Sequence, residues 1–378
     1  MNKISILHPF TPKAAGVVEK SVATYHSQPH VKAMANLAMK KNYTCVMEYF
    51  TPKWFRYSSS DAVLQWNFYP VDFTLNGDHK KWKKQRSSAC LKYYKKETPD
   101  VTIINMSGHS SPFSYELSKI ILEKGKKYIA MLGGQHYTEA DWTRDYYKKA
   151  NHILVHTHLQ KREMKTMDMF KGLDIRVFPL GVDCNVFAPG NDNNTAPELL
   201  YVGRIVAWKR VHLAIEAVYK LTQNGFPDAR LNIIGPTSSE EYLKELKALV
   251  QKYNLSENVF FLGHKEHHEL SKYFQKADLF LLPSDKETFG MVMIESMASG
   301  TPVAGMDCPG GPADVITNGV DGILSTPEDY PNSVLQFFQN KELAKQMTTN
   351  ARKTAVAKYS IQETTRVLFE SVQSALRS

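Results

Sequence analysis

The sequence predicts an α/β protein with two doubly wound parallel sheets, each covered by helices on both faces. Three observations lead to this prediction. Short apolar runs alternate with helix-like stretches along the chain, as they do where crossover helices join parallel strands. A polar, turn-rich strip at 188–197 interrupts the alternation, and the pattern restarts beyond it. The 378 residues are also enough for two domains of ordinary size.

The first half of the chain has the runs expected for one such sheet. Buried strands are predicted at Ile4–Leu7, Thr44–Tyr49, Val101–Asn105, Tyr128–Leu132, His152–Val155 and Arg176–Pro179. Helices are predicted between them at His30–Lys40, Phe113–Glu123 and Thr138–Lys149. We therefore expect a first Rossmann-like domain over residues 1–187.

The second half repeats the pattern. Strands are predicted at Leu199–Val202, Arg230–Ile234, Val259–Leu262, Leu279–Pro283 and Pro302–Ala304, and helices at 209–223, 239–253, 267–276 and 289–299. We expect a second Rossmann-like domain over 188–359, followed by an amphipathic terminal helix at 360–378. In folds of this kind, ligands bind at the carboxyl ends of the strands, which here predicts a cleft between the two domains.

The net charge of +9 is distributed unevenly along the chain. Residues 1–190 carry 28 Lys and Arg against 16 Asp and Glu, whereas the remainder is slightly acidic. In the densest cluster, the region Lys80–Lys96, lysines alternate with Trp and Tyr, which suits an anionic membrane surface. A solvated, lysine-rich helix or loop is the alternative. No nucleic-acid-binding module is recognisable, so no nucleic-acid partner is expected.

Cysteine usage and the lack of long apolar runs indicate the compartment. The four cysteines show neither a metal-binding spacing nor a disulfide framework, which fits a reducing environment. The first residues turn polar too soon for a signal peptide, and no run reaches the length of a membrane span. We expect a cytoplasmic protein, peripheral on the inner face of the membrane if the lysine cluster binds lipid.

Two glutamates eight residues apart, Glu287 and Glu295, are the most informative feature of the chain. They flank Phe289-Gly290, at the predicted entrance of a short helix. A glycine there lets another molecule reach the exposed N–H groups, and the helix dipole favours an anion such as phosphate. Apolar neighbours surround Glu295, so we expect an enclosed carboxylate that needs partners, such as ribose hydroxyls. Two ordinary surface charges are the alternative.

A second group of residues follows the predicted strand Leu199–Val202. Gly203 and Arg204 lie at the strand end and Lys209 at the start of the next helix. A guanidinium fork and a movable ammonium make a plausible diphosphate clamp, although basic residues at such turns are common. The GxGxxG and P-loop motifs are absent, so neither NAD binding nor NTP hydrolysis is predicted.

Together these motifs resemble the nucleotide-binding domain of the retaining GT-B glycosyltransferases of family 4. The matching pieces are Tyr201-Val202-Gly203-Arg204 with Lys209, Ile233-Ile234-Gly235-Pro236, 259–263, 277–284 and 287–303. The flanking segments 178–187 and 310–324 also fit. The order and spacing of these pieces are specific, whereas residues 1–175 resemble the family only in pattern. The resemblance implies two such domains facing across a cleft, with the terminal helix crossing back to the first.

The resemblance also implies roles for residues. Arg204 and Lys209 would bind the donor diphosphate, Glu295 the ribose, and Glu287 the hydroxyls of the donor sugar. The implied donor-binding set is Gly16, Gly203, Arg204, Lys209, Glu287, Phe289, Gly290, Met291, Val292 and Glu295. The implied catalytic set is Glu287, His136, Lys209 and Arg204. Transfer would retain the anomeric configuration and need no metal or cofactor, and a UDP-sugar is favoured over a GDP- or ADP-sugar.

The first half departs from the family pattern at two places. Many members have a double glycine after the first strand, but here Gly16 is the only candidate. Many also have a histidine after a middle strand, for which His136 is the first choice and Gln135 the alternate. His109 follows another predicted strand, and any of these can be a loop residue without catalytic duty. Gly310-Gly311 and Asp314 are interpreted as a turn and a helix cap.

The resulting prediction is a retaining glycosyltransferase that moves a sugar from a nucleotide diphosphate sugar to a glycan or lipid-linked acceptor. Basic charge in the acceptor-side half favours an anionic or membrane-borne acceptor, as in cell-envelope or polysaccharide biosynthesis. A sugar-nucleotide epimerase or a phosphorylase is the alternative within the fold, although no cofactor lysine is evident for a phosphorylase. A non-catalytic sugar-nucleotide or glycan-binding protein is the alternative from another class.

Overall fold

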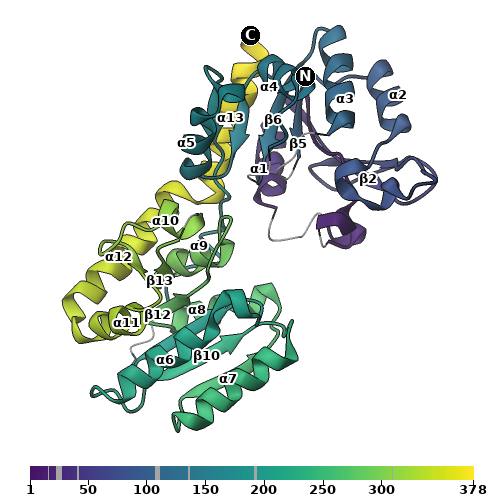
Figure 1. Ribbon diagram of the computed structural model, residues 1–378. Coiled ribbons are helices and arrows are strands. Elements are labelled where there is room, and N and C mark those ends of the chain that lie inside the picture. The colour runs from purple at the N-terminus through teal and green to yellow at the C-terminus, as the bar shows by residue number, and fades with distance from the viewer. Residues whose placement is uncertain are drawn as a thin grey trace. The chain divides into compact units, whose positions relative to one another are not determined.

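The computed structural model describes residues 1–15, 17–22, 28–40, 42–106, 111–134, 137–190, 194–308 and 310–378. These residues form two compact units (Figure 1). Unit 1 comprises Met1–Leu180 and Ile361–Ser378, and unit 2 comprises Gly181–Ser360. The polar strip at 188–197 therefore lies within unit 2, and the terminal helix groups with unit 1.

Unit 1 is built on an eight-stranded sheet with the order β3-β4-β2-β1-β5-β6-β7-β8. The strands are β1 (Asn2–His8), β2 (Tyr43–Thr51), β3 (Tyr57–Ser60), β4 (Gln65–Pro70), β5 (Val101–Asn105), β6 (Lys127–Leu132), β7 (Ile153–Val155) and β8 (Ile175–Val177). All neighbouring strands are parallel except β3 and β4, which form an antiparallel edge. The parallel sheet confirms the predicted fold class, whereas β3 and β4 were not predicted.

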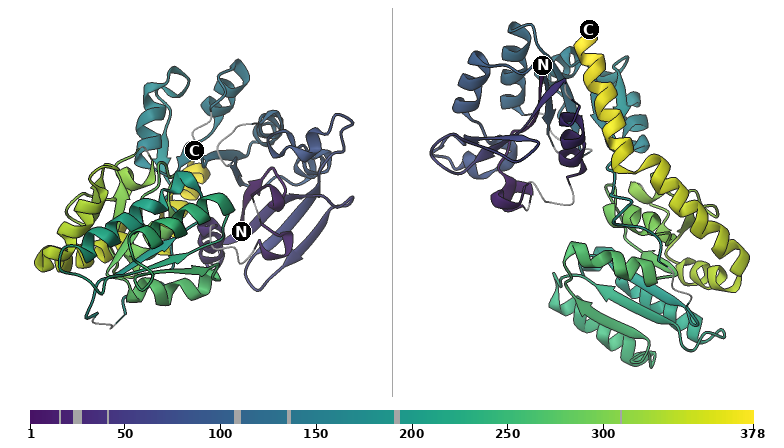
Figure 2. Two further views of the ribbon diagram at one scale, coloured as in Figure 1. Left: turned by 60° about the horizontal axis from the view of Figure 1, so that its bottom comes forward. Right: turned by 180° about the vertical axis from the view of Figure 1, so that it is seen from behind.

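Helices cover both faces of this sheet. They are α1 (Pro29–Ala38), α2 (Ser88–Lys96), α3 (Pro112–Glu123), α4 (Asp141–Lys149), α5 (His158–Thr166) and α13 (Ile361–Arg377). Because side chains alternate along a strand, Ile4 and Ile6 of β1 face α1 and α13, whereas Leu7 faces the opposite core with α2 and α3. The terminal helix α13 thus completes one of the two cores of unit 1 (Figures 1 and 2).

Unit 2 has a six-stranded, all-parallel sheet with the order β11-β10-β9-β12-β13-β14. The strands are β9 (Glu198–Val202), β10 (Arg230–Ile234), β11 (Val259–Gly263), β12 (Leu279–Leu282), β13 (Val303–Met306) and β14 (Gly322–Ser325). The chain moves outward from β9 in one direction through β10 and β11, and then in the other through β12 to β14. The switch point therefore lies between β9 and β12, where doubly wound sheets bind their ligands.

The helices of unit 2 also lie on both sides of its sheet. They are α6 (Val211–Thr222), α7 (Glu240–Lys252), α8 (Leu270–Lys276), α9 (Met291–Ala298), α10 (Gly311–Val315), α11 (Tyr330–Gln339) and α12 (Lys341–Lys358). α6, α7 and α11 pack on the core built from Leu199, Tyr201 and Leu281, and α6 and α7 contact each other (Figure 2). None of the helices in the described residues is long and apolar enough to cross a membrane.

The lysine-rich region Lys80–Lys96 is only partly available as a surface. It forms short 3-10 turns, including Asp78–Lys80 and Trp82–Lys84, followed by α2. Tyr94 is buried and donates a hydrogen bond to the buried carboxylate of Glu48, so it is part of the core. The lysines of the 3-10 turns remain exposed.

Candidate functional site

Two loops at the carboxyl ends of β9 and β12 bring Lys209 and Glu287 together. The Lys209 ammonium donates a hydrogen bond to Oε1 of Glu287, and both side chains are only about one-tenth exposed, at 12% and 11%. The backbone N–H of Asp285 donates to the carbonyl of Trp208 at 3.0 Å, which ties the two loops to each other. The two loops therefore bring Lys209 and Glu287, two of the predicted site residues, into direct contact.

The sequence predicted that Lys209 lies at the start of a helix, and this prediction is wrong. It ends a 3-10 turn, Ala207–Lys209, and Arg210 follows with a left-handed backbone (φ 48°), so that α6 begins only at Val211. The sharp turn places the Lys209 ammonium 4.5 Å from the centre of the Trp208 ring. Arg204 is exposed and lies 5.6 Å from the same ring. Both cations of the predicted clamp thus contact Trp208.

Helix α9 begins at Met291, because Gly290 directly before it has φ 83°, a conformation that favours glycine. Phe289 and Gly290 therefore precede the helix instead of opening it. Met291 and Val292 form the first turn and are half-buried. The first N–H groups of a helix have no partner within it, so α9 presents donors and a positive dipole end next to Glu287.

The tandem glycines Gly310 and Gly311 let the loop that contains them approach the loop that carries Glu287. The Gly311 N–H donates to the carbonyl of Glu287 at 2.9 Å. A Cβ added at Gly310 would lie 1.9 Å from the Glu287 carbonyl oxygen, and one added at Gly311 would lie 1.9 Å from that of Phe289. Only glycine permits this approach. Gly310 is also the residue directly before helix α10, which agrees with the predicted turn and cap.

Glu295 is enclosed within α9, as the sequence predicted. Its side chain is 2% exposed, and its Oε1 lies 2.7 Å from Nε2 of His267. The other oxygen, Oε2, is buried without a hydrogen-bond partner among the described residues. A buried, unpartnered carboxylate oxygen is unfavourable unless a ligand supplies a donor.

His267 was missed in the sequence. It begins a 3-10 turn, His267–Glu269, soon after β11, and its ring lies 5.4 Å from that of Phe187. The only signal in the sequence was a His-His pair downstream of the β11 strand, which does not by itself indicate contact with Glu295.

The strand end of β9 approaches that of β10 closely. A Cβ on Gly235, which has φ 146°, would lie 1.9 Å from the carbonyl oxygen of Gly203. The Tyr201 hydroxyl donates to the carbonyl of Arg204 at 2.9 Å and so fixes the turn that carries the clamp. Burial raises the pKa of Tyr201, and the charge of Glu287 raises it further, so this hydroxyl stays protonated.

Several predicted residues of the first half lie outside the described residues. These are Gly16, His136 and the alternates Gln135 and His109. Among the described residues at the carboxyl ends of the strands of this sheet are His8, at the end of β1, and Asn105, at the end of β5. His8 Nε2 lies 2.9 Å from Nε2 of His30 and 3.1 Å from Nδ2 of Asn105.

The hydrogen bonds of His8 determine its tautomer. The amide nitrogen of Asn105 can only donate, so His8 accepts at Nε2 and carries its proton at Nδ1, which faces the carbonyl of Glu48 at 3.4 Å. Burial lowers the pKa of His8 to about 3 and also lowers that of His30. Both imidazoles are therefore neutral at physiological pH.

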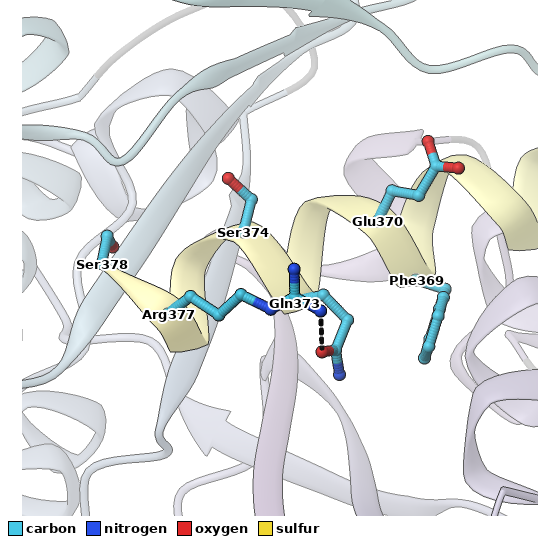
Figure 3. A pocket seen from close by; sticks show the side chains of 6 residues that line it. All are labelled: Phe369, Glu370, Gln373, Ser374, Arg377 and Ser378. Atoms are coloured by element: carbon cyan, nitrogen blue, oxygen red, sulfur yellow. Dashed lines mark hydrogen bonds between the residues drawn. The ribbon is translucent and has the colours of Figure 1, made fainter.

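Hollows also occur away from the predicted site in the described residues. One lies along the last turns of α13 and is lined by Phe369, Glu370, Gln373, Ser374, Arg377 and Ser378 (Figure 3). Its lining comes from α13 and from Ser378 directly after it, and Glu370 is already engaged by Arg366 at 2.5 Å. No group of three His, Cys, Asp or Glu side chains in the described ranges could hold a metal ion.

Comparison with known proteins finds matches to the same region of the chain. Residues 185–354 match the glycosyl transferases group 1 family. A glycogen synthase of Mycobacterium tuberculosis is 34% identical over 158 residues, which cover 41% of this chain and 37% of the relative. A D-inositol 3-phosphate glycosyltransferase of Mycobacterium sp. (strain JLS) is 30% identical over 192 residues, covering 48% and 42%. The matched part thus spans about two fifths of the length of these relatives.

Solved structures resemble the whole chain in fold. A sucrose-phosphate synthase from Thermosynechococcus elongatus matches with a TM-score of 0.70 and 16% identity over 100% of both chains. An Anabaena protein in complex with UDP matches with a TM-score of 0.69 and 14% identity, covering 99% of this chain and 100% of the other. At such low identity the likeness shows the fold alone, which is GT-B with two parallel-sheet α/β domains.

Proposed function

We propose that the protein is a glycosyltransferase, because residues 185–354 match the glycosyl transferases group 1 family. It moves a sugar from a nucleotide diphosphate sugar to a glycan or lipid-linked acceptor. The observation that carries the proposal is Glu295, a buried carboxylate with one oxygen bound to His267 and the other unpartnered. A ribose offers two neighbouring hydroxyls, one of which can donate to that free oxygen.

The groups around Glu295 suit the rest of a sugar nucleotide. The start of α9 supplies backbone donors and a positive dipole end for a phosphate. Arg204 and Lys209 bind the two phosphates, and Gly203 keeps the β9 turn open beside them. Glu287, next to Lys209, accepts hydrogen bonds from hydroxyls of the donor sugar. Phe289, Gly290, Met291 and Val292 line the path between these groups.

Transfer proceeds with retention and without a metal ion or cofactor. The bond between the anomeric carbon and the diphosphate breaks, and the acceptor hydroxyl forms its bond to the same face of that carbon. The acceptor's proton passes to the departing phosphate oxygen. Lys209, Arg204 and the α9 dipole stabilise the negative charge that develops on the diphosphate, which is the main catalytic contribution.

The remaining roles that we propose belong to residues of the first half of the chain. We assign His136, which lies outside the described residues, to the donor sugar, with Gln135 or His109 as alternates. Gly16 is assigned to the phosphates on the same reasoning. The basic first half favours an anionic or membrane-borne acceptor, so we place the reaction on the cytoplasmic side of a membrane, in cell-envelope or polysaccharide biosynthesis.

UDP-sugars are the first donors to test, since UDP is bound in solved structures of the same fold. The experiment measures free nucleotide released from UDP-, GDP- and ADP-sugars, with and without EDTA. Release from one donor that is unaffected by EDTA is the expected result. Conversion of the sugar without nucleotide release would favour an epimerase, and tight binding without turnover under any acceptor would favour a non-catalytic binder.

A further inference from the structure

We propose that the edge of unit 1 formed by the segments 10–22, 52–57 and 71–87, here called the tip edge, inserts apolar side chains into an anionic lipid bilayer. Residue 16 lies outside the described residues and plays no part in this inference. The inference goes beyond sugar transfer and does not depend on it.

Five large apolar side chains protrude from the tip edge. Leu75 is 99% exposed, Trp54 89%, Val18 68%, Phe73 65% and Phe55 63%. Exposed apolar residues are normal when they are scattered singly over a surface. Here they belong to three segments that follow the carboxyl ends of β1, β2 and β4. Chance scatter is therefore a poor explanation.

Strand pairing brings two of the segments together. The parallel register of β2 and β4 ends at the pair Thr51 and Pro70, and the Val71 N–H donates to the Thr51 carbonyl at 3.0 Å. The turn with Trp54 and Phe55 and the loop with Phe73 and Leu75 therefore leave neighbouring strand ends.

The third segment is held against the first by side chains. The Lys53 ammonium lies 3.6 Å from a carboxylate oxygen of Glu19, and the Tyr57 hydroxyl donates to the same carboxylate. Val18 precedes Glu19 directly. The rings of Phe10 and Trp82, whose centres lie 5.8 Å apart, join this segment to the 71–87 loop. The three segments are thus one continuous surface.

The tip edge is strongly basic. Its three segments carry nine Lys and Arg against three Asp and Glu. Each of the three carboxylates is already paired within the edge: Glu19 with Lys53, Asp72 with Arg86, and Asp78 with both Lys81 and Lys84. Lys80 and Lys83 remain exposed beside the apolar tips. The charge therefore complements a surface of anionic headgroups.

The shape favours a bilayer over a protein groove. Side chains that are more than half exposed stand out from the surface instead of lining a depression. Trp, Phe and Leu on protruding turns can enter the boundary between headgroups and acyl chains, while long lysines beside them reach phosphates. Insertion combined with electrostatic attraction provides the two contributions that stable peripheral binding requires.

The test is sedimentation of the full chain with vesicles of phosphatidylcholine, with and without phosphatidylglycerol. We expect binding to the anionic vesicles that is weakened by salt. The tip variant Trp54→Ser, Phe55→Ser, Phe73→Ser, Leu75→Ser should bind at least about tenfold more weakly. Lys80→Gln, Lys83→Gln should weaken binding about fivefold for each charge removed.

A matched control carries Val320→Ser and Val356→Ser, which alter valines of unit 2 that are 47% and 43% exposed. It should bind vesicles like the wild type. The melting temperatures of all variants are compared to exclude unfolding. Trp54 also gives a direct spectroscopic readout. Its fluorescence emission should shift to the blue when vesicles are added, and the Trp54→Phe variant should lack that shift.

Failure of wild type to bind either vesicle would overturn the inference, as would a tip variant that binds like wild type. Retained binding by the tip variant together with loss in the lysine variant would indicate electrostatic contact without insertion, which also contradicts it. Nucleotide release from a soluble donor should be unchanged in the tip variant. An inactive protein that still binds vesicles would reject the proposed function and leave this inference standing.

Discussion

Glu295 and His267 meet through one hydrogen bond of 2.7 Å, in which the imidazole Nε2 engages Oε1 of a carboxylate that is 2% exposed. The two residues lie 28 positions apart, on α9 and on the turn after β11. This bond fixes the orientation of the carboxylate and leaves Oε2 as the free acceptor. His267 is therefore a positioning residue for the proposed donor site.

Replacing His267 by alanine should weaken donor binding more than it slows the chemical step. Without the imidazole, both oxygens of Glu295 lack a partner and the carboxylate loses its fixed orientation. We expect KM for the sugar nucleotide to rise about tenfold, the effect of losing a hydrogen bond to a charged group, with kcat nearly unchanged. Steady-state kinetics measure both. His267→Asn, which can still donate, should recover part of the loss, and an unchanged KM in His267→Ala would contradict the assignment.

Lys209→Ala should act mainly on turnover. The ammonium is proposed to stabilise charge on the departing diphosphate, so its removal should lower kcat about a hundredfold. KM should change less, because Arg204 and the start of α9 still bind the phosphates. The neighbouring Arg210, paired with Asp285, supplies a control, since Arg210→Ala removes a cation from the same loop without touching Glu287. Equal effects of both substitutions on kcat would argue against a specific role for Lys209.

The His8–His30 pair should make unit 1 sensitive to acid. Both pKa values are lowered in the folded state, so the folded protein binds fewer protons than the unfolded chain below pH 6.5. For His8 the stabilisation is fully present above pH 6.5 and is lost as the pH falls toward 3. Each buried neutral histidine should lower the free energy of unfolding by up to about 1.4 kcal/mol per pH unit in that window.

Urea unfolding between pH 7 and pH 4 measures this dependence. His8→Gln, which can still donate to the Glu48 carbonyl, should flatten the pH dependence relative to wild type. His264→Gln, on a histidine of unit 2 with a 63% exposed side chain, should leave it unchanged. Parallel curves for wild type and His8→Gln would contradict a buried neutral histidine at this position.

Gly310→Ala should damage both stability and activity. The new Cβ would overlap the carbonyl oxygen of Glu287, and backbone atoms cannot move aside without displacing the Glu287 loop. We expect a loss of about 3 kcal/mol or more in unfolding free energy, with a drop in turnover. Gly225→Ala is the matched control, because Gly225 also has positive φ (91°) but open space at its Cβ. It should cost about 1 kcal/mol from backbone strain alone and preserve activity.

The sequence was sufficient for the fold class because strand and helix periodicities differ and crossover helices separate successive strands. It was also sufficient for the enclosure of Glu295, whose helix neighbours are almost all apolar. Edge strand β3 was missed because Tyr57–Ser60 is mostly serine and lacks an apolar face. The start of α6 was misplaced because a left-handed Arg210 is not a conformation that its residue type suggests.

Contacts between segments that are distant in the sequence could not be predicted from the sequence alone. His267 follows β11 and Glu295 lies on α9, which follows β12, and these two strands are separated in the sheet by β10 and β9. The exposed tips at Trp54 and Leu75 also look like any other apolar residues in the sequence. The turns that carry them leave the neighbouring ends of β2 and β4 and expose them. The pairing of β4 with β2, which places these turns next to each other, was not predicted.

The donor site is tested most directly by the melting temperature of wild type and Glu295→Ala in the presence of UDP, GDP and ADP. We predict that one nucleotide raises the melting temperature of wild type in a concentration-dependent way and does not raise that of Glu295→Ala. Glu257→Ala, which removes an exposed glutamate of unit 2, should respond like wild type. No response of wild type to any nucleotide, or an equal response of Glu295→Ala, would contradict the proposed site.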